Sequence, residues 1–208
     1  MHVDYSVYLV TDRGILDGRD LFKAVENAIQ GGASLIQLRE KDISSRGFYE
    51  LAVQIKKLVN SYNVPLIIND RIDIALAVEA DGLHIGQEDI PLGIARKIMG
   101  PDKIIGYSVS NLEQAIFGEK NGADYLGAGP VYPTGSKADA GAPIGTRNLK
   151  AIKERVSIPV VAIGGVSSAN ISEVRKTGVD GVSVISAILG SQDIAEAAKN
   201  ITALWKGK

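Results

Sequence analysis

Short runs of β-branched and aliphatic residues alternate with amphipathic segments along the whole chain. The runs predict strands, and the segments between them carry apolar residues at helical spacing, as in Phe48, Ala52 and Ile55. Each strand is followed by a predicted helix. The expected strands are residues 5–11, 34–39, 65–69, 83–86, 103–108, 125–129, 159–164 and 181–186.

Eight βα units without a break in composition predict an α/β protein, a closed (β/α)8 TIM barrel that spans residues 1–208 as a single domain. An open doubly wound sheet is the competing architecture. It has about five or six strands, so the strand number favours closure.

A weak internal repeat accompanies the alternation. The sequences "GGAS" (31–34), "EADG" (79–82), "NGAD" (121–124) and "TGVD" (177–180) each lie between a predicted helix and a predicted strand. Gly31, Gly122 and Gly178 fit the position after a helix end, where a residue with positive φ is favoured.

One connection is much longer than the others. The segment "PVYPTGSKADAGAPIG" (130–145) shows neither helical nor strand periodicity. Long loops in compact domains are often functional, and this one follows the sixth strand, at the face where barrel enzymes carry their active sites. The sequence therefore predicts a lid at about residues 130–145.

Composition narrows the function classes. The chain has 208 residues, a net charge of −1 and no cysteine. Overall charge therefore gives no attraction to nucleic acid or acidic membranes, and disulfides and thiolate metal sites are excluded. No signal peptide or membrane span is recognisable, so a cytoplasmic location is expected.

Polar residues and glycines gather at the predicted carboxyl ends of the strands. Singly, each has a simpler role: Asn69 or Asp70 could cap the next helix, and His84 is more typical of a core histidine. Their shared location at one end of the barrel favours a ligand site. The set comprises Gln37, Arg39, Lys41, Asn69, Asp70, Asp89, Ser108, Thr134, Ser136, Lys137, Gly164, Gly165, Ile185 and Ser186.

Alternation along the second strand separates the residues of "QLREKD" (37–42) into two groups. Gln37, Arg39 and Lys41 share one face, expected to be the barrel interior, whereas Leu38 and Glu40 take the other. The interior residues would then be aimed at a ligand, with Gln37 deepest.

The charged members predict a magnesium-bound diphosphate. Asp70 and Asp89 come from adjacent strands, and hard carboxylate oxygens suit Mg²⁺. Arg39, Lys41 and Lys137 could neutralise a multiply charged anion.

Glycines at the last two strand ends predict a second anion site. Gly164 and Gly165 allow close backbone approach, and Ile185 and Ser186 begin the next helix. Phosphate binding by these loops recurs in this barrel. One diphosphate and one phosphate together suggest a transfer reaction in which the diphosphate leaves.

These residues resemble the thiamine-phosphate synthases over nearly the whole chain. The shared motifs are "YLVTDR", "QLREKD", "IINDRIDIA", "ADGLHIGQED", "GYSVS", "GADYLGAGPVYPTGSK", "IPVVAIGGV" and "DGVSVISAI". The resemblance implies a (β/α)8 barrel that joins a hydroxymethylpyrimidine diphosphate to a thiazole phosphate and releases pyrophosphate. It also implies that the C–O bond breaks first, so no nucleophilic side chain is required.

The resemblance assigns the site residues as follows. Asp70 and Asp89 would bind Mg²⁺, and Arg39, Lys41, Ser108 and Lys137 would be catalytic. The pyrimidine diphosphate would be bound by Gln37, Leu38, Arg39, Glu40, Lys41, Asn69, Ser108 and Lys137. The thiazole phosphate would be bound by Thr134, Gly135, Ser136, Gly164 or Gly165, Ile185 and Ser186.

The residues argue against three alternative functions. A thiazole tautomerase of the same fold and a non-catalytic ligand sensor would both lack the diphosphate machinery, and Arg39, Asp70 and Asp89 are present. A sugar-phosphate isomerase or epimerase would leave the lid and the diphosphate cluster without a role. The expected partners are small-molecule substrates, with no nucleic acid and no membrane; whether the chain forms a homo-oligomer is left open.

Overall fold

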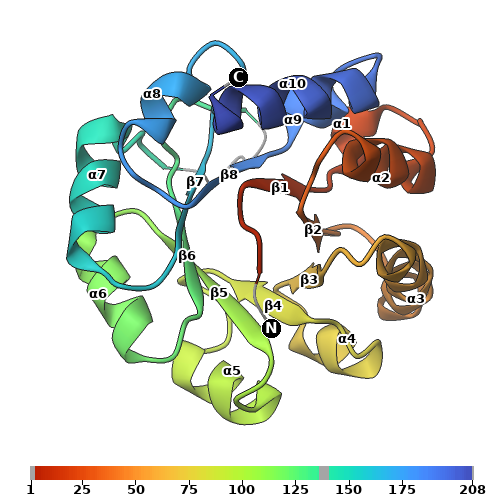
Figure 1. Ribbon diagram of the computed structural model, residues 1–208. Coiled ribbons are helices and arrows are strands. Elements are labelled where there is room, and N and C mark those ends of the chain that lie inside the picture. Colours follow the sequence, from red (N-terminus) through yellow and green to blue (C-terminus); the bar gives the residue numbers. More distant parts are fainter. Residues whose placement is uncertain (1–2, 136–140, 208) are drawn as a thin grey trace.

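The computed structural model describes residues 3–135 and 141–207, which form a closed barrel of parallel strands surrounded by helices (Figure 1). The first and last strands pair with each other, so the predicted closed barrel is confirmed over the open sheet. The strands are β1 Val7–Val10, β2 Leu35–Leu38, β3 Leu66–Asn69, β4 Gly82–Ile85, β5 Ile104–Val109, β6 Tyr125–Ala128, β7 Val160–Ile163 and β8 Gly181–Val184.

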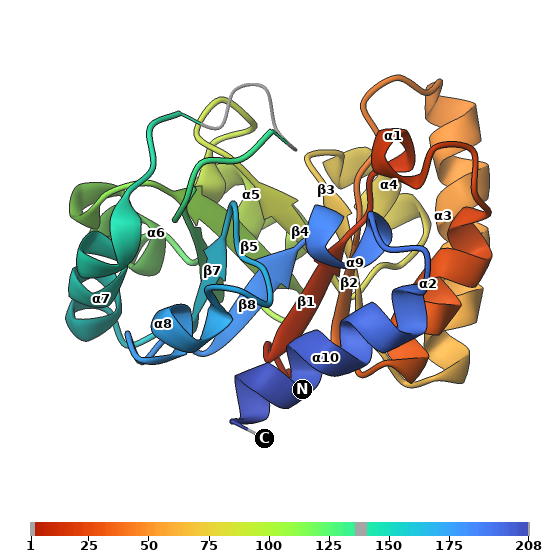
Figure 2. The ribbon, with the colours of Figure 1, turned by 90° about the horizontal axis from the view of Figure 1, so that it is seen from above.

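Helices connect successive strands on the outside of the barrel (Figure 1). Figure 2 shows the end of the last helix and the start of β1 at the same end of the barrel, opposite the loops that leave the carboxyl ends of the strands. The helices are α1 Arg13–Leu16, α2 Leu21–Gln30, α3 Ser45–Ser61, α4 Ile72–Ala77, α5 Leu92–Met99, α6 Leu112–Lys120, α7 Gly145–Arg155, α8 Ile171–Arg175, α9 Ser186–Leu189 and α10 Ile194–Lys206.

Strand alternation divides the core into two parts. Outward residues such as Leu9, Ile36 and Ile68 pack against the helices in one large cluster. A smaller cluster fills the barrel interior near the amino ends of the strands. Its members are Tyr5, Tyr8, Leu35, Ile67, Ile104, Tyr125 and Val161.

The predicted strands all overlap observed ones, and their ends differ by no more than two residues. The glycine prediction is confirmed at Gly122 and Gly178, whose φ values are 94° and 83°. It is wrong at Gly31, which has φ −77° and remains right-handed. Gly32 takes the left-handed conformation instead, with φ 106°. The right-handed backbone of α2 thus continues through Gly31, one residue further than predicted, and the left-handed residue follows at Gly32.

The "GGAS/EADG/NGAD/TGVD" repeat has a defined structural role at three of its sites. Asp81, Asp124 and Asp180 each precede an even-numbered strand. Their Oδ2 atoms accept the backbone N–H of Leu66, Ile105 and Val160, at or next to the start of the preceding odd-numbered strand, at 2.7 Å each.

Basic side chains from the helices before β3, β5 and β7 pair with the same three carboxylates. They are Lys56, Arg96 and Lys153. In the first copy Ser34 takes the place of the aspartate, and its Oγ accepts the N–H of Val7 at 3.1 Å. The repeat therefore ties each odd strand to the even strand that follows it.

Within the residues that the structure describes, no helix is both long and apolar enough to cross a membrane.

We expect Asp180→Ala to lower the free energy of unfolding by about 1–3 kcal/mol, because the N–H of Val160 loses its acceptor. Lys153→Met removes only the partly exposed ion pair and should cost less, about 0.2–1 kcal/mol. Urea denaturation followed by circular dichroism measures both. Equal losses in the two variants would contradict the role assigned to the backbone hydrogen bond.

Candidate active site

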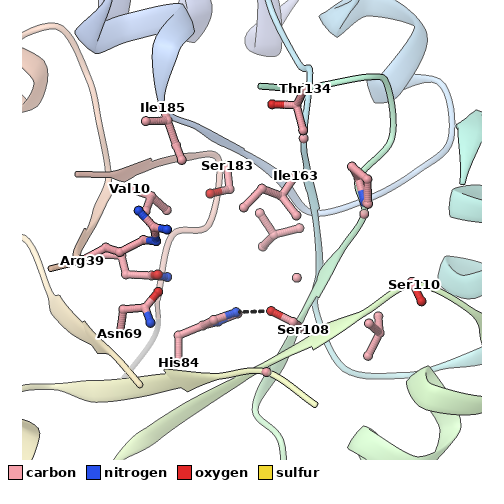
Figure 3. Close-up of a pocket in the computed structure, with 18 of the residues that line it drawn as sticks. Val10, Arg39, Asn69, His84, Ser108, Ser110, Thr134, Ile163, Ser183 and Ile185 are labelled. Atoms are coloured by element: carbon pink, nitrogen blue, oxygen red, sulfur yellow. Dashed lines mark hydrogen bonds between the residues drawn. The ribbon is translucent and has the colours of Figure 1, made fainter. Parts of the chain in front are cut away.

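A cavity of about 660 Å³ opens at the carboxyl ends of the strands. Figure 3 shows side chains from around the barrel converging on it, with Arg39 and Asn69 on one side, Ile163 across from them, and Ser183 and Ile185 in between. The structure brings twelve predicted site residues together on its wall: Gln37, Arg39, Lys41, Asn69, Asp70, Asp89, Ser108, Thr134, Gly164, Gly165, Ile185 and Ser186.

Leu38, Glu40 and Gly135 do not line the cavity. Leu38 is fully buried in the outer core, and the carboxylate of Glu40 pairs with Arg13 at 2.7 Å. Both follow from the alternation along β2, which turns these two side chains away from the barrel interior. Gly135 lies on an exposed part of its loop. Ser136 and Lys137 lie outside the described residues, as does the centre of the predicted lid.

The end of β2 presents its polar face to the cavity, as the alternation predicted. Gln37 is buried at the floor, with 4% of its surface exposed. Arg39 and Lys41 follow on the same face towards the opening. The polar side chains on this wall therefore lie at successive depths, from Gln37 at the floor to Lys41 nearest the opening.

The junction between β1 and α1 holds the end of β2 in place, a role that the motif "YLVTDR" did not reveal. Thr11 Oγ1 accepts the backbone N–H of Arg39 at 3.0 Å. Asp12 caps α1 through Oδ1 and pairs with the guanidinium of Arg39 through Oδ2 at 3.2 Å. Arg13 binds Glu40. Thr11 and Asp12 thus fix the backbone and side chain of Arg39, and Arg13 holds the neighbouring Glu40.

Two carboxylates meet at the ends of β3 and β4. Burial raises the pKa of Asp89, and the negative charge of the neighbouring Asp70 raises it further, whereas the N–H of Gly86, donated to Asp89 Oδ2 at 2.7 Å, opposes the shift. Asp70 pairs with Lys41 and has a φ of 59°, a left-handed conformation uncommon outside glycine. Two adjacent carboxylates in this setting favour a bound cation.

Neither Asn69 nor Asp70 caps the next helix. The residue at the start of α4 is Arg71, and no side-chain hydrogen bond caps it. The simpler explanation for these two residues is therefore wrong, and both side chains face the cavity.

The floor of the cavity carries a continuous set of hydrogen bonds, which we call the floor relay. It runs from Gln37 Nε2 to Tyr8 Oη (2.7 Å), on to Tyr125 Oη (2.8 Å), to His84 Nδ1 (2.8 Å), and from His84 Nε2 to Ser108 Oγ (2.9 Å; Figure 3). His84 is therefore bonded at both ring nitrogens. Its inward position in a period-two strand was the only signal in the sequence.

Sequence reasoning also missed Ser183, a buried residue of β8 on the cavity wall. Among the described residues its Oγ has no hydrogen-bond partner. A buried hydroxyl without a partner costs free energy unless a ligand or water satisfies it.

Glycines shape the opposite side of the cavity. Gly164 and Gly165 have φ values of 89° and 66°, and a Cβ would lie 2.5 Å from Pro130 Cβ and 2.7 Å from Tyr132 Cβ, respectively. Asn170 Nδ2 donates to the carbonyl of Gly165 at 2.8 Å. Only glycine lets this turn pack so closely against the loop after β6.

A closed barrel with ionic groups on one side of a carboxyl-end cavity and glycine turns on the other has the features of a (β/α)8-barrel enzyme. The chain belongs to the thiamine monophosphate synthase family, whose model matches residues 7–188.

Individual relatives agree over the full length. A thiamine-phosphate synthase of Desulfitobacterium hafniense is 57% identical over 206 residues, covering 99% of this chain and 100% of the relative. One from Clostridium novyi is 55% identical over 201 residues, covering 97% and 98%. The solved thiamine phosphate pyrophosphorylase from Pyrococcus furiosus has a TM-score of 0.90 at 42% identity, covering 98% and 96%.

The comparisons confirm the family, the barrel fold, and the transferase with thiamine-phosphate synthase activity that the motifs predicted. The tautomerase and sensor alternatives are not favoured.

We expect Arg13→Ala to lower the free energy of unfolding by about 1–3 kcal/mol, because the carboxylate of Glu40, 5% exposed, loses its cation. The double variant Arg13→Ala/Glu40→Gln carries no unpaired charge and should recover most of the loss. Chemical denaturation of the three proteins provides the test. A double variant no more stable than the single one would show that the unpaired charge is not the cause.

Proposed function

We propose that the cavity binds a hydroxymethylpyrimidine diphosphate beside a thiazole phosphate, joins the two ring systems and releases pyrophosphate. The observation that carries the proposal is the shared cavity wall: Arg39, Lys41, Asp70 and Asp89 lie on it together with the glycine turn at Gly164–Gly165. The names of the curated relatives support the product assignment.

The carboxylate pair fits a magnesium ion. Burial and the neighbouring Asp70 raise the pKa of Asp89, and a cation between the two carboxylates would offset both effects. Mg²⁺ typically takes one or two carboxylates and completes its coordination with phosphate oxygens and water. In the described part of the chain no group of three or more acidic, histidine or cysteine side chains could hold a metal ion by itself. When bound, the ion would stabilise the negative charge of the departing diphosphate.

The side chains on the β2 side would bind and orient the pyrimidine diphosphate. Arg39 can present a guanidinium fork to phosphate oxygens, and Lys41, now paired with Asp70, can add a point charge. Gln37 and Asn69 lie deeper and would bind the pyrimidine ring, with the unsatisfied hydroxyl of Ser183 close by. Lys137 and Ser136 join this assignment through the family motif alone.

Backbone groups on the other side would hold the second substrate. The positive-φ turn at Gly164–Gly165 and the start of α9 at Ser186 bring N–H groups to the cavity wall, where a phosphate monoester can accept them. Thr134 would add a hydroxyl, and Ile185 would contact the thiazole. Holding both substrates in one cavity supplies the alignment that the bond-forming step needs.

Purified protein supplied with both substrates and Mg²⁺ should release pyrophosphate and thiamine phosphate in equal amounts. Coupled phosphate detection and product chromatography measure the two. Isomerisation of the thiazole without pyrophosphate release would instead indicate a tautomerase, and no product above an enzyme-free control would refute the synthase proposal.

Asp70→Asn and Asp89→Asn should each raise the Mg²⁺ concentration for half-maximal activity by at least about 10-fold, because each removes a proposed ligand. Asp73→Asn is the matched control, since Asp73 lies on the neighbouring helix α4 and pairs with Arg71 outside the cavity. Calorimetric titration of Mg²⁺ into protein with pyrophosphate gives a second readout. Titrations unchanged from the parent protein would refute the metal assignment.

The cytoplasmic location and the absence of nucleic-acid partners stay predictions from the sequence.

A further inference from the structure

The floor relay has a defined direction. Each tyrosine hydroxyl has one hydrogen to donate and can also accept hydrogen bonds. Gln37 Nε2 donates to Tyr8 Oη, and the buried Tyr8 hydrogen has an acceptor in this set only if it goes to Tyr125 Oη. The Tyr125 hydrogen then goes to His84 Nδ1, so this direction satisfies every buried donor of the relay. A neutral His84 then carries its hydrogen on Nε2 and donates it to Ser108 Oγ.

Both tyrosines keep their hydrogen near neutral pH. Burial raises the pKa of Tyr8 and of Tyr125 above the ordinary value, and for Tyr125 the neighbouring tyrosines add to the shift. Ionised phenols are thus excluded, and the hydrogen count of the relay does not change.

The barrel makes room for the relay at a specific place. Gly106 pairs in register with His84 on one neighbouring strand and with Tyr125 on the other. A Cβ at Gly106 would lie 2.1 Å from Tyr125 Cζ and 2.4 Å from His84 Nδ1. Any side chain at position 106 would block the Tyr125–His84 hydrogen bond, which crosses β5 above the glycine.

We propose that Tyr125, together with Tyr8, is a positioning residue that couples the amide of Gln37 to the hydroxyl of Ser108 across the cavity floor. This inference deepens the proposed function and rests on it for the identity of the ligand. In this direction the side-chain carbonyl of Gln37 can accept a hydrogen bond from a ligand, and the hydroxyl of Ser108 can donate one to it.

These two groups match an aminopyrimidine. Its exocyclic amine can donate to the Gln37 carbonyl, and a ring nitrogen or a diphosphate oxygen can accept from Ser108. If only the Ser108 end reversed, the buried Tyr8 hydrogen would lose its acceptor in the relay, so the two tyrosines favour this orientation at both ends. The same direction excludes His84 as a base for Ser108, because Nε2 already carries the hydrogen.

Nitrogen NMR tests the direction without any substrate. The chain has two histidines, His2 and His84, so a sample labelled with ¹⁵N-histidine gives two imidazoles, which His2→Gln assigns. We expect His84 to show an unprotonated Nδ1 and a protonated Nε2 in the parent protein. A hydrogen on Nδ1, whether in the other tautomer or in the imidazolium, would overturn the proposal.

Kinetics test the coupling. Tyr125→Phe keeps the ring and removes the hydroxyl, and we expect kcat/KM for the pyrimidine diphosphate to fall by about 10- to 100-fold, with KM for the thiazole phosphate unchanged. Tyr8→Phe should give a similar loss. Because both break one relay, the double variant should lose little more than either single one.

Tyr62→Phe is the matched control, since its hydroxyl donates to Glu26 Oε1 at 2.7 Å between α2 and α3, away from the cavity. It should keep parental kinetics. Additive losses in the double variant, an equal rise in both KM values, or no loss in Tyr125→Phe would overturn the coupling. An inactive parent protein would refute the proposed function instead, and the NMR result would still decide the direction of the relay.

Discussion

The alternation of side chains along eight parallel strands is the constraint on which the rest of this molecule depends. A strand can place only every second residue inside the barrel, and the inside is narrow. In β2 this sends Gln37 inward and Leu38 outward, and just beyond the strand it sends Arg39 to the cavity and Glu40 to Arg13. Ligand contacts and structural contacts are thus interleaved residue by residue.

Limited interior space explains why the barrel uses glycine where it does. Aromatic rings at Tyr8 and Tyr125 fill the centre, and Gly106 and Gly127 on β5 and β6 leave room for Tyr125 and His84. The result is an interior that is closely packed and yet fully hydrogen-bonded along one line. Such a buried polar network is rigid only when each member is satisfied.

The fold was predictable because its signal is repeated. Eight strand patterns with helical segments between them require a barrel even if single boundaries shift by two residues, as they do here. Positions such as Arg39 and Asp89 were also predictable, because strand ends of parallel sheets meet at one face. The comparisons with relatives then supported the activity.

Three-dimensional contacts were beyond the reach of the sequence. His84 sits among apolar neighbours in its own strand, and its partners Tyr125 and Ser108 come from other strands. Glu40 lies within a motif that suggests ligand binding, yet it faces Arg13. The identity of a side chain does not reveal its partner when the partner lies across the barrel.

The aspartates that bind the starts of the odd strands have a consequence for how the barrel is assembled. Asp81, Asp124 and Asp180 each join one pair of strands and pair with a basic side chain of the helix before that pair, so three quarters of the barrel share one arrangement. In the first quarter an uncharged serine, Ser34, accepts the corresponding backbone N–H without a paired cation. The residues at the amino ends of the strands therefore follow an approximate fourfold internal repeat that most of the sequence does not show.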